Sequence, residues 1–84
     1  MDIHVPKYEV ANGFVFEWNE GFYIQCEYDD YNTIVIKANT EGLISLARHL
    51  LEMSQVEVPI GTHIHLDEYN SLSAGSNEII IEKL

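Results

Sequence analysis

In the first half of the chain, hydrophobic, β-forming residues gather in short runs, and polar turn signals separate them. Four runs show this pattern: "YEV" (8–10), "FVFEW" (14–18), "FYIQCEY" (22–28) and "TIVIKA" (33–38). Turns rich in Asn, Asp and Gly separate these runs. Because β-forming runs between turn signals are typical of antiparallel strands, we predict a meander of three or four strands between Tyr8 and Ala38.

The period changes to that of a helix after residue 38. Asn39 or Thr40 offers an N-cap, and Glu41 falls in the first turn. Apolar residues then recur at helical spacing, at Leu43, Leu46, Ala47, Leu50 and Leu51. The pattern predicts one amphipathic helix from Glu41 to Ser54, with His49 on its polar or boundary side.

Two further runs after the helix have strand character. They are "THIHLDE" (62–68) and "NEIIIEKL" (77–84), joined by the loop "YNSLSAGSN". A β-meander, a helix and a β-hairpin together predict an α+β fold, in which an antiparallel β-sheet of five to six strands carries one α-helix on one face. Since no repeat or linker interrupts the chain, we expect residues 1–84 to form a single domain.

Strand alternation divides the side chains between two faces of such a sheet. The helix-facing set is expected to be Phe14, Phe16, Trp18, Phe22, Ile24, Cys26, Ile34, Ile36, Ile64, Leu66, Ile79 and Ile81. The open face would then carry Val15, Glu17, Tyr23, Gln25, Glu27, Val35, Lys37, His63, His65, Asp67, Ile80 and Glu82. Apolar and tyrosine anchors among carboxylates are typical of a protein-contacting surface, and an ordinary solvated sheet face is the alternative.

The net charge of the chain limits which classes of molecule it is expected to bind. Four Lys and Arg residues against 14 Asp and Glu residues give a net charge of −10. Such a field repels nucleic acids and anionic membranes and attracts a basic partner, so neither nucleic acid nor membrane is expected to bind.

No apolar run approaches the roughly 20 residues of a transmembrane helix, and no leader opens the chain, so we expect a soluble, cytoplasmic protein. The single cysteine, Cys26, cannot form an internal disulfide and is expected to be a buried thiol.

The stretch "GTHIHLDEY" (61–69) places His63, His65 and Asp67 at every second position. On a strand these side chains share one face, close enough for two imidazoles to hold a metal ion. A zinc site commonly needs three protein ligands, however, and a bare H-x-H pattern is a weak signal. We therefore predict no metal and no other cofactor, with these three residues as weak candidates, and we interpret the row as part of a binding surface.

Catalysis has little support in the sequence. The serines lie on predicted helix or loop without a strand-turn-helix elbow, and there is no glycine-rich phosphate loop. The adjacent carboxylates Asp29 and Asp30 are more typical of a turn than of a catalytic pair. We predict that the protein is not an enzyme.

The last third of the chain, "GTHIHLDEYNSLSAGSNEIIIEKL" (61–84), resembles the immunity protein 32 family of small bacterial immunity proteins. The residues that carry the likeness are His63, His65, Leu66, Asp67, Glu68, Gly75, Ser76 and Glu78. The resemblance implies a non-enzymatic antidote that binds and neutralises a cognate toxin of a polymorphic or contact-dependent system. It transfers no catalytic residue.

The acidic charge and this resemblance lead to one hypothesis, in which an acidic surface occupies the basic substrate site of a nuclease-like toxin. The expected partner-binding residues are Tyr23, Glu27, Asp29, Asp30, His63, His65, Asp67 and Glu68. Two alternatives remain open. One is a small metal-binding protein or enzyme that uses His63, His65 and Asp67, and the other is a structural subunit that forms a homodimer through its open face or last strand.

Overall fold

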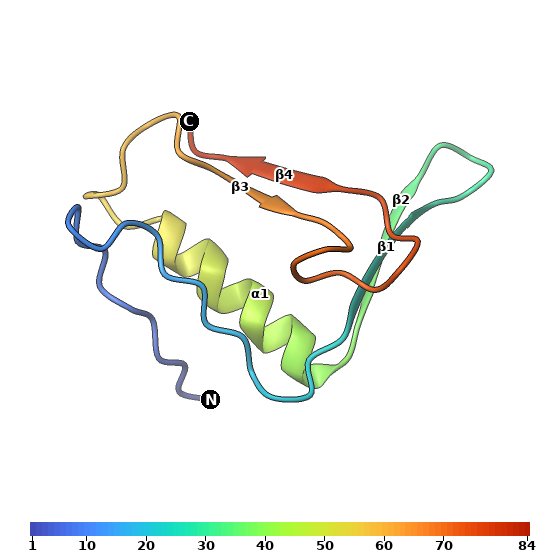
Figure 1. Cartoon of the computed structure of the whole chain (residues 1–84), viewed down its shortest axis with the longest axis horizontal. Coiled ribbons are helices and arrows are strands. Elements are labelled where there is room, and N and C mark those ends of the chain that lie inside the picture. Colours follow the sequence, from blue (N-terminus) through green and yellow to red (C-terminus); the bar gives the residue numbers. More distant parts are fainter.

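The computed structural model describes residues 1–84 and contains one helix and four strands (Figure 1). In chain order these are β1 (Ile24–Tyr28), β2 (Ile34–Ala38), α1 (Thr40–Met53), β3 (His63–Leu66) and β4 (Ile79–Glu82). The α+β class, the single helix and the antiparallel pairing are as predicted. No helix in the structure has the length and apolar character that crossing a membrane would need.

The predicted sheet of five to six strands is wrong. The structure has two separate antiparallel pairs, β1 with β2 and β3 with β4. The loop before β4 connects the pairs, because the Ser73 and Asn77 amides donate to the carbonyls of Ile24 and Cys26 at 2.8 Å each. Loop residues thus occupy the outer edge of β1, where the prediction placed a further strand.

The predicted strands between residues 8 and 18 are also absent, apart from one bridge between Glu9 and Gly13. The reason lies in what we call the aromatic segment, residues 14–19, which runs in extended form beside α1. The amides of Val15, Glu17 and Asn19 all donate to side chains of the helix rather than to a strand. Figure 1 shows this part of the chain, in blue to cyan, running along α1.

Three polar side chains of α1 accept these amides, each at 2.9 Å: Glu52 Oε2 from Val15, His49 Nε2 from Glu17, and Ser45 Oγ from Asn19. Alternate residues of an extended chain are about 6.6 Å apart, and helix positions three or four apart rise about 4.5–6 Å. The two spacings nearly match, so the helix can bond every second amide of the segment.

This arrangement corrects the prediction for the helix surface. His49 is 1% exposed instead of lying on a polar boundary, and Ser45, Arg48 and Glu52 are buried beside it. The leucines of the predicted apolar stripe lie partly in solvent, with Leu43 57% exposed. The polar face of α1 is buried because it bonds to the aromatic segment.

The start of α1 is fixed by one of the two predicted N-cap candidates. Asn39 is the N-cap, and its Oδ1 accepts the amides of both Gly42 (2.8 Å) and Tyr23 (2.9 Å). Residue 42 must be glycine, because a Cβ at this position would lie only 2.5 Å from the Tyr23 carbonyl oxygen. The helix therefore begins tightly against the chain that enters β1.

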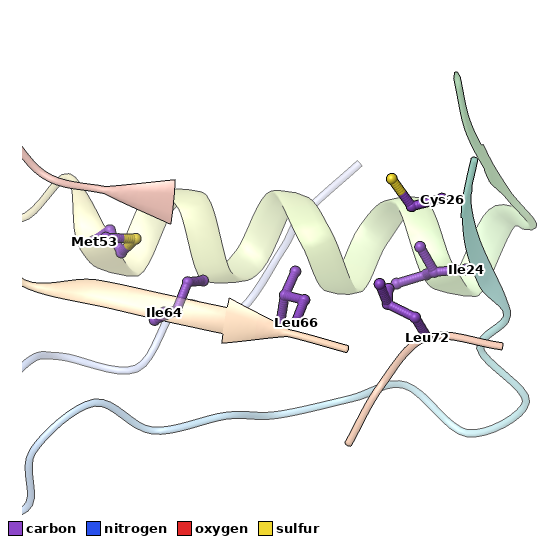
Figure 2. Close-up of a cluster of buried hydrophobic side chains, with 6 residues drawn as sticks. All are labelled: Ile24, Cys26, Met53, Ile64, Leu66 and Leu72. Atoms are coloured by element: carbon purple, nitrogen blue, oxygen red, sulfur yellow. The ribbon is translucent and has the colours of Figure 1, made fainter. Parts of the chain in front are cut away.

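The core lies between α1 and the strands and consists of Ile24, Cys26, Met53, Ile64, Leu66 and Leu72 (Figure 2). Ile64 and Leu66 point from β3 toward the helix. Cys26 is a buried free thiol, as predicted. Phe14, Trp18, Phe22, Ile79 and Ile81 are partly buried and pack against this cluster.

Two residues predicted to face the helix do not. Ile34 and Ile36 are about half exposed, because the β1–β2 hairpin extends past the end of the core. Phe16 is 47% exposed but meets His49 of the helix, with ring centroids 5.4 Å apart.

Candidate functional site

A cleft of about 310 Å³ lies between the aromatic segment and β3. One wall is formed by Phe14, Phe16 and Trp18, and the other by residues 63–66 with Asn70 beside them. We call this the β3 cleft. Its lining combines aromatic rings, two histidines and an amide, and contains neither Lys nor Arg.

The aromatic wall is held by contacts between successive rings. The ring centroids of Phe14 and Phe16 are 5.0 Å apart, and those of Phe16 and Trp18 are 6.3 Å apart in a stacked arrangement. The imidazole of His49, on the helix, meets Trp18 edge-on with ring centroids 4.3 Å apart. This buried histidine therefore anchors both the backbone and a ring of the segment.

The opposite wall carries the histidine row that the sequence singled out. His63 and His65 are exposed neighbours with ring centroids 5.1 Å apart. His65 Nδ1 lies 3.1 Å from Glu78 Oε2, and His63 Nδ1 donates to the Gly61 carbonyl at 3.2 Å. Both rings are thus oriented by a polar neighbour, and each Nε2 has no protein partner.

Asp67 does not complete a metal site with these histidines. Its Oδ1 accepts the Tyr69 amide at 2.9 Å, and its carbonyl accepts the Leu72 amide at 2.8 Å, so it shapes the turn after β3. No group of three or more His, Cys, Asp or Glu side chains in the structure lies in a position to hold a metal ion.

Other predicted contact residues also stabilise turns. Glu68 Oε2 accepts the Gly75 amide at 2.8 Å across the loop before β4. Asp29 Oδ1 accepts the amides of Tyr31 and Thr33 in the β1–β2 turn, at 2.9 Å each. Asp30 in the same turn is exposed and makes no side-chain bond.

The predicted contact residues fall into two groups rather than on one open face. Tyr23, Glu27, Asp29 and Asp30 belong to β1 and its flanking residues, whereas His63, His65, Asp67 and Glu68 belong to β3 and its turn. Figure 1 shows the β1–β2 hairpin at one end of the molecule and the β3–β4 hairpin along α1. Glu27 forms an ion pair with Lys37 at 2.8 Å, which raises the pKa of Lys37.

A second hollow, of about 270 Å³, lies between the two hairpins. It is lined by Cys26, Tyr28, Ile34, Ile36, Asn77, Glu78, Ile79 and Ile80. We call it the hairpin hollow. It could not be predicted while Ile34 and Ile36 were expected to pack against the helix.

Two buried polar residues under the aromatic segment, His49 and Glu52, have pKa values that differ from their ordinary ones. Burial lowers the pKa of His49 below its ordinary value of 6.5, and the charge of Arg48 lowers it further. Burial also raises the pKa of Glu52 above its ordinary value of 4.5, although the Val15 amide bond opposes this. His49 Nδ1 and Glu52 Oε1 are buried without a hydrogen-bond partner, so both residues are best accommodated uncharged.

Comparison with known proteins bears on what these surfaces do. Residues 33–84 match the family model described as Immunity protein 32. This range includes β2, α1, β3 and β4, and it is wider than residues 61–84, which carried the resemblance in the sequence. Neither the curated proteins nor the solved structures include a match to the chain.

The family match covers more than half of the chain, from the strand before the helix to the last residue. It contains the histidine row and the whole β3–β4 hairpin, while the aromatic segment lies before it. The chain belongs to the Immunity protein 32 family.

Proposed function

We propose that this protein is an antidote that binds a cognate bacterial toxin and neutralises it by contact, without chemistry of its own. The observation that carries this proposal is the match to Immunity protein 32 over residues 33–84. The exposed surface of the β3 cleft is consistent with binding, since it combines apolar and polar groups.

The charge supports a basic toxin surface as the target. The net charge of −10 would accelerate encounter with a basic substrate site, such as that of a nuclease-like toxin domain. Asp29, Asp67 and Glu68 already accept amides within turns, so they contribute charge while keeping their local bonds. Asp30 and Glu82 are exposed with no side-chain bond and are free to meet a partner directly.

The test uses a toxin domain encoded beside the gene for this chain. Growth is measured in cells that express the toxin domain with or without this protein, and affinity is measured by calorimetry with the purified pair. We expect growth to be restored and a complex of defined stoichiometry. Continued killing at equal expression, with no measurable complex, would refute the proposed function.

Charge reversal tests the acidic surface separately. We expect Asp30→Lys with Glu82→Lys to weaken toxin binding by about tenfold or more at low salt. Asp2→Lys with Glu57→Lys is the matched control, because these exposed carboxylates also make no side-chain bond and the net charge changes equally. If both pairs weaken binding equally, the location of the acidic groups is irrelevant and only net charge acts.

A further inference from the structure

The outer edge of β3 presents backbone groups that no part of the chain uses. The Lys83 amide donates to the Thr62 carbonyl at 2.8 Å, which fixes the phase of the β3–β4 pairing. Because antiparallel pairs alternate between bonded and non-bonded, Ile64 and Leu66 bond to β4, whereas the backbone groups of His63 and His65 point away from it.

Nothing else in the molecule takes up these outward amides. Neither the His63 nor the His65 amide makes a hydrogen bond outside the β3–β4 pair, and of the two carbonyls only that of His65 is used, by Asn70 Nδ2 at 3.0 Å. An exposed strand edge of this kind is a template for another extended chain. The edge of β1, by contrast, is occupied by Ser73 and Asn77.

The space next to this edge fits an extended chain. The β3 cleft runs along residues 63–66, and Phe14, Phe16 and Trp18 form its far wall. A strand added to β3 would bond to the backbone of His63 and His65 and lay alternate side chains on these rings. The cleft therefore supplies both a direction for the added chain and an apolar surface for it.

The charge around the cleft indicates what kind of chain it accepts. No Lys or Arg lines it. Glu17 lies in sequence between two lining residues, but its carboxylate is 4.0 Å from Arg48 Nε, so Glu78 and Glu82 supply the negative charge beside the cleft. Glu78 meets the His65 ring, and Glu82 pairs with His63 across the hairpin. An extended segment that carries Lys or Arg among apolar residues matches this setting.

We propose that an extended, basic segment of the toxin adds as a strand to the free edge of β3, in the cleft between β3 and the aromatic segment. This inference rests on the proposed function and specifies how the partner is held. Backbone bonds at His63 and His65 supply part of the affinity, and the aromatic wall selects the side chains.

The direct test removes one outward amide. His65→Pro eliminates the N–H of residue 65 without breaking a bond to β4, so we expect toxin affinity to fall by about tenfold or more. Ile80→Pro is the matched control, since Ile80 pairs with His65 and its amide lies on the opposite edge of the same hairpin without a hydrogen bond. His65→Ala, which keeps the amide, should bind within about threefold of the unmodified protein.

Each outcome is informative once thermal unfolding shows that the variants are folded. A loss confined to His65→Pro supports strand addition to β3. Unchanged binding by His65→Pro, or equal loss in both proline variants, overturns it. A proline variant that fails to fold is replaced by amide exchange of the unmodified protein, where protection of the His63 and His65 amides on toxin binding is expected and its absence overturns the inference.

Two further results would point to a different occupant of the edge or to a different function. If the unmodified protein forms a dimer that His65→Pro converts to a monomer, the edge is occupied by a second copy and not by the toxin. If the unmodified protein neither binds nor neutralises the toxin domain, the proposed function itself fails.

Trp18 is the only tryptophan in the chain and lines the cleft, so its fluorescence should change on toxin binding.

Discussion

β1 and the aromatic segment are both extended stretches beside the same helix, but they are held in different ways. β1 pairs with β2 on one edge and the loop before β4 on the other, and it buries Ile24 and Cys26 completely or nearly so. The aromatic segment pairs with no strand, and its alternate amides bond to Ser45, His49 and Glu52 of α1. The segment does not pair with β3, and the outer edge of β3 stays open.

The largest expected effects test whether burial holds β1 and polar bonds hold the segment. Ile24→Ala should lower the free energy of unfolding by about 3 kcal/mol and accelerate amide exchange throughout the protein. His49→Ala should lower the free energy of unfolding by about 2 kcal/mol, since it leaves the Glu17 amide without an acceptor and removes the ring contact with Trp18. Its faster exchange should be largest at the Val15, Glu17 and Asn19 amides.

The measurements are urea unfolding and amide exchange by NMR. His63→Ala is the control for His49→Ala, because His63 is exposed and its replacement should change stability by about 0.5 kcal/mol or less. If His49→Ala accelerated exchange in β1 as much as in the segment, the two stretches would unfold as one unit and the contrast between them would be wrong.

The sequence predicted the parts of this fold that depend on local signals. Asn39 as a cap and the apolar period placed the helix within a residue of its bounds, and the "THIHLDE" and "NEIIIEKL" runs contained β3 and β4. The "FVFEW" run has the β-forming composition of a strand, but its bonding partner is a row of helix side chains. Strand periodicity shows that a stretch is extended and cannot show what accepts its amides.

The candidate site divides in the same way. The exposure of His63 and His65 followed from alternation on one strand, and the structure has both on the solvent side. The β3 cleft depends on where the aromatic segment lies relative to residues 63–66, which are more than 40 positions away in sequence. The sequence contains one signal for the position of the aromatic segment. Ser45, His49 and Glu52 share a side of the predicted helix, and together they could accept the amides of an extended chain.

An intermediate effect on the free energy of unfolding is expected from pH, through two buried residues that hold the segment. The pKa of His49 is lowered by burial, so the unfolded chain takes up a proton below about pH 6.5 that the folded protein resists, and stability falls on acidification. The pKa of Glu52 is raised, so its contribution has the opposite sign and favours folding as pH drops toward 4.5. The two contributions partly cancel between these values.

Urea unfolding of three proteins between pH 7.5 and 5 would separate these contributions. We expect Glu52→Gln to lose stability on acidification more steeply than the unmodified protein, because the compensating group is gone. His49→Gln should lose less, because it has no proton to take up at this position. Identical slopes in all three proteins would mean that water reaches both residues in solution and that the polar bonds to the segment are not buried.

The smallest effect on stability is expected on the outer face of β1, where Glu27 and Lys37 form an exposed ion pair. Replacing either with Ala should leave the free energy of unfolding almost unchanged, in contrast to Ile24 on the inner face. The same variants should change toxin association in opposite directions at low salt, because Glu27→Ala reduces the negative charge and Lys37→Ala increases it. Stopped-flow association rates at two salt concentrations measure this difference, and equal rates for the two variants would show that the charge of β1 does not contribute to capturing the toxin.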